Sequence, residues 1–169
     1  YDYTSAVFGE DLDSPQQVGA SAAERTLSRL GPQKPATGQF PVVYHQRVAG
    51  SLVGTLAGAI NGAAIARGTS FLKDSMGEQI TSPGLTFIDD PLRPRGMASR
   101  LFDGEGLAVS RRAMVEDGVL KSWFLDIASA TKLGLAPTGQ AARGMGSSPA
   151  PGSSNFYLEN GDISFCLLY

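Results

Sequence analysis

Residues 107–125 read LAVSRRAMVEDGVLKSWFL, and this stretch decides the fold class. Two runs rich in apolar residues, 107–115 and 119–125, flank the turn sequence EDG at 116–118. Asp-Gly between such runs is typical of a tight β-hairpin, because these residues adopt the positive φ that the turn requires. We therefore expect two antiparallel strands here, within an α+β fold that has a mainly antiparallel, twisted sheet and a few helices.

Local signals outside this hairpin predict the other elements. A helix begins at Ser14-Pro15, because serine caps a helix N-terminus and proline fits the first turn, and Gly31-Pro32 ends it. The remaining predictions, in chain order, are a short edge strand at 40–44, a strand at 85–88, a helix from the cap Asp126 to Lys132, a long loop at 133–155, and a second hairpin in which 156–158 and 163–168 flank Asn160-Gly161.

Residues 48–66 read VAGSLVGTLAGAINGAAIA and carry no charge. Glycines recur every four residues, at 50, 54, 58 and 62, so we expect them to line one side of a helix and to let another backbone approach closely. The same spacing of small residues occurs in membrane helices. Polar residues at 51, 55 and 61, and a cost of about 1 kcal/mol for each glycine, instead favour a helix of a soluble protein, buried against the sheet or a partner.

Composition and charge exclude several classes of function. The 169 residues suffice for one domain with its own core, and the formal net charge of −2 gives no attraction to nucleic acid. A charged fraction of 18% is low, which favours a domain that buries part of its surface against another domain or subunit. The single cysteine, Cys166, and the absence of a leader-like start predict a cytoplasmic protein without disulfides.

Few side chains could carry catalysis. A catalytic zinc ion takes three protein ligands, and the chain has one histidine, His45, and one cysteine, Cys166. Asp103 and Glu105 stand two residues apart and could contribute to a cation site or a general base, although a turn before a strand also explains them. Neither a nucleophile elbow nor a phosphate-binding loop is present. The residues alone therefore predict no complete catalytic constellation.

Several strings together point to a known family. They are GTS at 68–70, GEQ at 77–79, IDDP at 88–91, FDGEGLAV at 102–109, EDGVL at 116–120, LGLAPTGQAARG at 133–144 and PAPGSSNFYL at 149–158. With them, residues 1–158 resemble the C-terminal domain of the TldD/PmbA family, in its PmbA (TldE) branch. The resemblance implies one domain over 1–169, with the family's N-terminal domain absent before residue 1 and a shortened closing segment at 159–169.

The resemblance also implies a function for this domain. In the family, a TldD-type subunit carries an HExxxH zinc motif on a helix, pairs with a PmbA-type subunit, and cleaves small or unfolded peptides. Aligning the GTS strings without a gap puts Val53, Gly54 and Gly58 at the His, Glu and His positions, and these side chains can neither bind zinc nor activate its water. The resemblance thus implies a non-catalytic partner subunit that holds no cofactor and acts in proteolysis or peptide maturation, with zinc in a TldD-type partner.

The sites and partners that follow are expectations. We expect the partner- or peptide-contacting residues to include Gly50, Gly62, Asp103, Glu105 and Arg143. The partner is a TldD-type subunit or a second copy of the chain, and neither nucleic acid nor a membrane is expected. One alternative is a metallopeptidase in its own right with a site recruited from His45, Asp103 and Glu105. Another is a regulator of DNA gyrase or of toxin–antitoxin action, which the family's older name as a gyrase modulator suggests.

Overall fold

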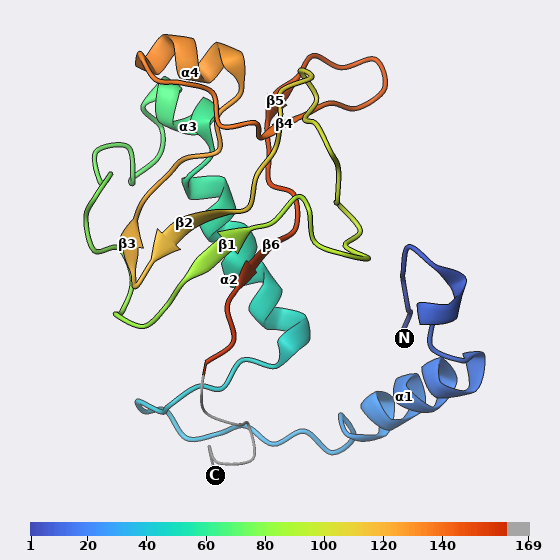
Figure 1. Cartoon of the computed structure of the whole chain (residues 1–169). Helices are drawn as coiled ribbons and strands as arrows, with labels where there is room; N and C mark the ends of the chain where they lie inside the picture. Colours follow the sequence, from blue (N-terminus) through green and yellow to red (C-terminus); the bar gives the residue numbers. More distant parts are fainter. Residues whose placement is uncertain (162–169) are drawn as a thin grey trace. The chain divides into compact units, whose positions relative to one another are not determined.

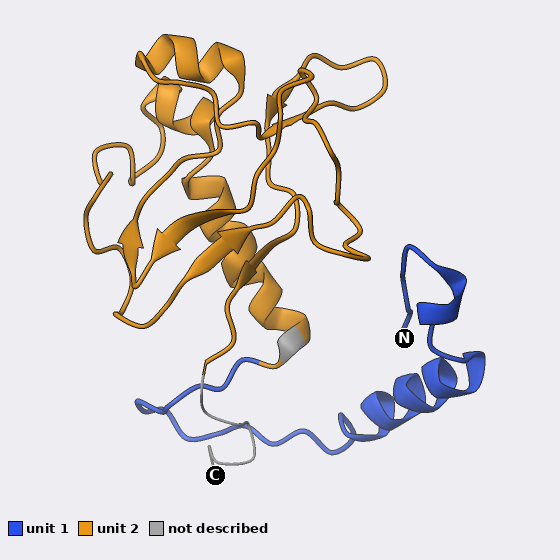
Figure 2. Cartoon of the chain, in the orientation of Figure 1, with its two compact units in different colours: residues 1–44 blue, residues 45–169 orange. Residues whose placement is uncertain are grey.

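A computed structural model describes residues 1–161, and of Gln46 it describes the backbone alone (Figure 1). The chain divides into two compact units, residues 1–44 and 45–169 (Figure 2). The first unit contains the 3-10 helix η1 (Gly9–Asp11) and the helix α1 (Pro15–Leu27). The second unit contains the sheets and the remaining helices, and it holds the hydrophobic core.

Helix α1 begins as its sequence predicts. The Ser14 hydroxyl accepts a hydrogen bond from the Gln17 backbone N–H, and the Gln17 side chain accepts one from the Ser14 N–H, which is a complete capping box. The helix ends at Leu27, before the predicted Gly31-Pro32 stop. None of its residues is buried, and the Leu27 side chain is 65% exposed, whereas Val18 and Ala22 on the apolar face of α1 are half-buried.

The predicted edge strand at 40–44 is wrong, because the structure shows no regular element there. Pro41 lacks the N–H that a ladder needs, and within residues 1–161 no strand pairs with this segment. Its side chains accordingly remain exposed, with Phe40 at 60% and Val42 at 67%. Apolar character alone does not make a strand when no partner strand lies beside it.

The main sheet is antiparallel, with the order β3-β2-β1-β6. Its strands are β1 (Phe87–Asp89), β2 (Arg112–Glu116), β3 (Val119–Leu120) and β6 (Phe156–Leu158). Asp117 and Gly118 have φ values of 48° and 78°, which confirms the hairpin predicted at 116–118. The predicted 133–155 loop contains a second, two-stranded sheet, formed by β4 (Ala141–Ala142) and β5 (Ala150–Pro151). In the second predicted hairpin, 156–158 forms β6, whereas 163–168 lies outside the described residues.

The uncharged stretch 48–66 forms two helices, α2 (Gln46–Ala59) and α3 (Gly62–Arg67), so the prediction of one helix is wrong. Asn61 interrupts them in an extended conformation, and its side chain accepts a hydrogen bond from Ala63 N–H at 3.0 Å. Phe124 N–H donates to the Ile60 carbonyl, and Gly62 N–H donates to the Phe124 carbonyl. These two hydrogen bonds join the helices to a segment far away in the sequence. They take the place of the bonds that the Ile60 carbonyl and the Gly62 N–H would form inside one continuous helix. Within the described part of the chain, no helix has both the length and the apolar character needed to cross a lipid bilayer.

The core lies between the main sheet and the helices α2 and α3 (Figure 1). The side chains of Ile60, Met114 and Phe124 are at most 1% exposed, and burying each of them stabilises the fold by about 1.5–3 kcal/mol. The Phe156 ring packs edge-on against Phe124, with 5.3 Å between the ring centres. Helix α4 (Ile127–Leu133) begins at the predicted cap Asp126 and packs against α3. The α+β prediction is confirmed.

Candidate functional site

Beyond its first turn, which carries the exposed Arg47, helix α2 turns an uncharged face away from the core. Its opposite side, which includes Val53, packs against the buried cluster. The outward face consists of small exposed residues, namely Ser51, Gly54, Thr55 and Gly58. The Ser51 and Thr55 hydroxyls donate to carbonyls of the same helix, at 2.6 and 2.9 Å. Surface helices usually carry charged residues on this side. Beyond Arg47, the outward face of α2 is instead uncharged, and its Ser51 and Thr55 hydroxyls are already hydrogen-bonded.

The four predicted glycines have two different environments. A Cβ added at Gly50, Gly54 or Gly58 would meet no atom within 4 Å. A Cβ at Gly62 would lie 2.4 Å from the Phe124 carbonyl oxygen, which no side chain tolerates. Gly62 therefore serves the close packing of α3 inside this chain. The other three leave the backbone of α2 open to a second molecule.

The positions that the resemblance aligns with the zinc motif do not fit a zinc ion. Val53 faces the core, while Gly54 and Gly58 lie on the outward face of α2, and none of the three has a ligand atom. His45 caps the N-terminus of α2, where its Nδ1 accepts a hydrogen bond from Arg47 N–H at 3.2 Å. Within residues 1–161, no group of three or more His, Cys, Asp or Glu side chains is placed to hold a metal ion.

The Asp103 carboxylate organises a turn. Its side chain is buried, and its two oxygens accept hydrogen bonds from the backbone N–H groups of Glu105, Leu107 and Ala141, at 2.9, 2.9 and 3.1 Å. Glu105 accepts a bond from Ile127 N–H at 2.8 Å, at the start of α4, where a negative charge is favourable. Asp103 therefore positions backbone at its own turn and at β4, and Glu105 positions the start of α4.

Arg143 lies beside this turn, in the exposed loop that follows β4. A Cβ added at Gly104 would lie 3.0 Å from the Arg143 Cβ, so the two segments touch. The structure thus brings the predicted residues Asp103, Glu105 and Arg143 together in one place. Gly50, Gly54 and Gly58 form a second set, on α2. Cys166 lies outside the described residues.

A buried polar network that sequence reasoning missed joins three of the recognised strings. The Asp89 carboxylate is fully buried, and it accepts hydrogen bonds from Gln140 Nε2 at 2.8 Å and from Ser154 N–H at 2.7 Å. The Asn155 side chain donates to the Asp90 carbonyl and accepts from Ala98 N–H. These bonds fix the segments around the ends of β1 and β6. The only signal in the sequence was that these polar residues fall within the recognised strings.

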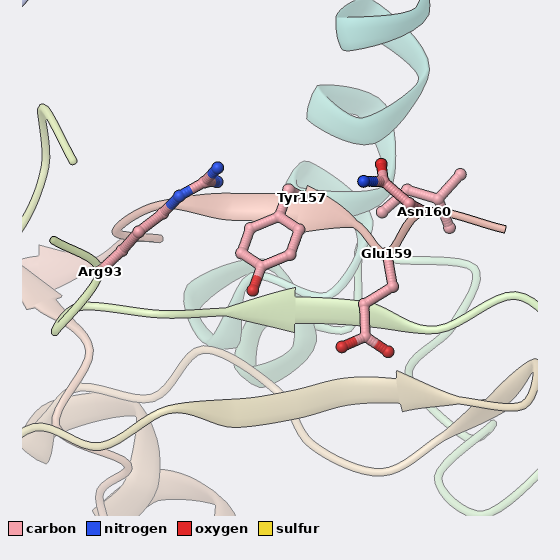
Figure 3. A pocket seen from close by; sticks show the side chains of 5 residues that line it. Arg93, Tyr157, Glu159 and Asn160 are labelled. Carbon is pink, nitrogen blue, oxygen red and sulfur yellow. The ribbon is translucent and has the colours of Figure 1, made fainter. Parts of the chain in front are cut away.

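An open pocket of about 590 Å³ lies beside β6 (Figure 3). Residues of β6, of the segment after it and of the loop after β1 line the pocket: Arg93, Tyr157, Leu158, Glu159 and Asn160. The Arg93 guanidinium lies over the Tyr157 ring, 4.8 Å from its centre, in a cation–π contact. Strand alternation places Tyr157 on the face of the sheet opposite to its neighbour Phe156, which packs in the core.

A second arginine supports this pocket from beside it. Arg111 Nη2 lies 2.7 Å from Glu159 Oε1. The neighbouring Tyr157 side chain and, to a smaller extent, the charges of Glu159 and Asp90 raise the pKa of Arg111 above its ordinary value, against the opposing effect of desolvation. Arg111 therefore forms an ion pair with one of the residues that line the pocket.

Comparisons with known proteins agree with this architecture. The family model described as the PmbA/TldA metallopeptidase C-terminal domain matches residues 37–168. The chain is 45% identical over 141 residues to Metalloprotease PmbA of Escherichia coli O157:H7, covering 83% of this chain and 31% of that protein. It is 36% identical over 141 residues to a PmbA homolog of Haemophilus influenzae, with the same shares covered. The chain thus spans about a third of the length of these curated relatives.

Two solved structures share the fold. A putative modulator of a DNA gyrase from Thermotoga maritima superposes with a TM-score of 0.84 and 31% identity, over 95% of this chain and 36% of that one. TldE from Thermococcus kodakarensis gives a TM-score of 0.65 and 29% identity, over 72% of this chain and 28% of that one. The match to the family model covers most of the sequence, and the relative from Escherichia coli O157:H7 covers 83% of it. The chain therefore belongs to the PmbA/TldA metallopeptidase C-terminal domain family.

Proposed function

We propose that the chain is part of a non-catalytic partner subunit in a TldD-type zinc metallopeptidase that cleaves small or unfolded peptides. The observation that carries the proposal is the character of α2. Where the resemblance aligns two zinc ligands and a general base, this helix has Val53, Gly54 and Gly58, which offer no ligand and no base. In the proposed assembly, the TldD-type partner supplies both the zinc ion and the base.

The outward face of α2 suits contact with that partner. Glycine at 54 and 58 lets a partner backbone approach the helix closely, because no Cβ stands between them. Burial of this face would leave no Ser51 or Thr55 hydroxyl without a hydrogen bond, since both hydroxyls already donate to carbonyls of the helix. Beyond the first turn, where Arg47 lies, it would also desolvate no charge. The proposed contact therefore carries little of the penalty that burying an ordinary surface helix would carry.

The proposed role includes helping to hold an extended peptide by strand addition at a sheet edge. One end of the main sheet is already covered, because Gln79 forms a bridge with Val119 of β3. At the other end, β6 bonds to β1 through alternate residues, so the backbone groups of Leu158 point away from β1. This edge of β6 is therefore the place where an extended peptide would add.

The test is cleavage of an unstructured peptide by a TldD-type subunit mixed with this chain, in which Gly58→Leu fills the open face of α2. The new side chain has no atom to clash with inside the chain, so the fold should persist. We expect cleavage to fall by about tenfold, equivalent to about 1.4 kcal/mol of lost association. The matched control is Gly19→Leu, which alters an equally open glycine in α1 and should leave cleavage unchanged. Full activity of Gly58→Leu would count against the proposed interface.

A further inference from the structure

The pocket beside β6 contains a cation, Arg93, that has no partner of opposite charge among the described residues. Within residues 1–161, Arg93 forms no ion pair, whereas the neighbouring Arg111 is paired with Glu159 at 2.7 Å. The nearby Asp90 carboxylate accepts a hydrogen bond from Leu92 N–H at 3.0 Å. Glu159, the acidic residue of the pocket lining, is thus already paired with Arg111, while the Arg93 guanidinium forms no ion pair in the described part of the chain.

The guanidinium also lies against an aromatic side chain. Arg93 is placed over the Tyr157 ring, with 4.8 Å between the guanidinium carbon and the ring centre, and both side chains line the pocket (Figure 3). A guanidinium that lies over an aromatic ring still has N–H groups to offer a planar acceptor, and its contact with the ring reduces the side-chain freedom that is lost when a ligand binds. The Asn160 amide lines the same pocket and can donate a further hydrogen bond.

We propose that this pocket binds a peptide carboxylate, with the Arg93 guanidinium as the group that recognises it. A carboxylate matches the geometry of a guanidinium edge through two parallel hydrogen bonds. Such a group comes either from an acidic side chain or from the C-terminus of a peptide. The inference deepens the proposed function, on which it rests for the expectation that peptides are the ligands.

The test measures binding to the chain alone, without partner or cleavage, so its failure would leave the partner-subunit proposal standing. Three fluorescent peptides of otherwise identical neutral sequence are compared by anisotropy at low salt. One carries an internal glutamate and a C-terminal amide, one carries glutamine and a free C-terminus, and one carries glutamine and an amide. We expect one of the two carboxylate peptides to bind about tenfold more tightly than the neutral peptide, and which one does so identifies the source of the carboxylate.

Variants of two exposed arginines connect the binding to this pocket. Arg93→Gln should abolish the preference for the carboxylate peptide. Arg93→Lys should weaken it, because lysine keeps the charge but lacks the planar fork. Arg67→Gln, which removes the same charge at the end of α3 and outside the pocket lining, should change nothing. Equal binding of all three peptides, or a preference that survives Arg93→Gln, would overturn the proposal.

Discussion

Replacing Gly62 by alanine places a single methyl group against a backbone. Its Cβ would lie 2.4 Å from the Phe124 carbonyl oxygen and 2.7 Å from a methyl carbon of Leu125. Gly62 N–H donates to that same carbonyl at 2.8 Å, and Phe124 N–H donates to the Ile60 carbonyl at 3.1 Å. The two segments therefore cannot separate to admit the methyl group without stretching these hydrogen bonds.

The expected cost follows from these contacts. Overpacking of a filled site costs about 1–3 kcal/mol, and the weakened hydrogen bond adds about 1 kcal/mol. Alanine in place of glycine also stabilises the folded state by at most about 1 kcal/mol, because alanine leaves the unfolded chain fewer conformations than glycine does. We predict that Gly62→Ala lowers the free energy of unfolding by about 1–3 kcal/mol. The control Gly54→Ala, in the middle of α2 with no atom within 4 Å of the new Cβ, should raise it by about 0.5–1 kcal/mol.

Urea denaturation followed by tryptophan fluorescence measures both variants. Trp123 is the only tryptophan of the chain and lies in the same core as Phe124, so its signal reports on this packing. With a slope of about 1–3 kcal/mol per molar urea, a loss of about 2 kcal/mol lowers the midpoint by about 1 M. An unchanged or higher midpoint for Gly62→Ala would refute the close packing of α3, and a lower midpoint for Gly54→Ala would refute the open face of α2.

Two further predictions concern the carboxylates. Asp103→Asn should destabilise the chain by about 1.5–3 kcal/mol in the same assay. Both Asp103 oxygens accept hydrogen bonds from Glu105, Leu107 and Ala141 N–H groups, whereas an amide has only one oxygen that accepts. The control Asp74→Asn, at an exposed position, should cost less than about 0.5 kcal/mol. After dialysis, atomic absorption should find much less than one zinc ion per chain, and stoichiometric zinc would instead support a site recruited from His45, Asp103 and Glu105.

The parts of the fold that could be predicted are those fixed by neighbouring residues. The turn at 116–118 and the caps Ser14 and Asp126 depend on chemistry within a few residues, and all three form as expected. The break at Asn61 depends on hydrogen bonds to Phe124 and Pro151, which lie far away in the sequence. A local sequence pattern does not show which distant residues will form hydrogen bonds with it. The pattern of 48–66 therefore predicts one helix where the structure has two.

The candidate site shows the same division. The positions Val53, Gly54 and Gly58 followed from a resemblance, whereas the exposure of the outward face of α2 is visible only in the structure. The Asp89 network joins residues that are 51 and 65 positions apart, so no spacing rule could have found it. The stacking of Arg93 on Tyr157 depends likewise on where the loop after β1 passes β6.

The most direct test of the partner-subunit account is cleavage of an unstructured peptide by the chain alone, by a TldD-type subunit alone, and by the two mixed, each with and without a metal chelator. We predict that the chain alone is inactive and that adding it raises cleavage by the TldD-type subunit, with the chelator abolishing the activity. Cleavage by the chain alone would contradict the account, because it would require a catalytic centre that α2 and the carboxylates of residues 1–161 do not form.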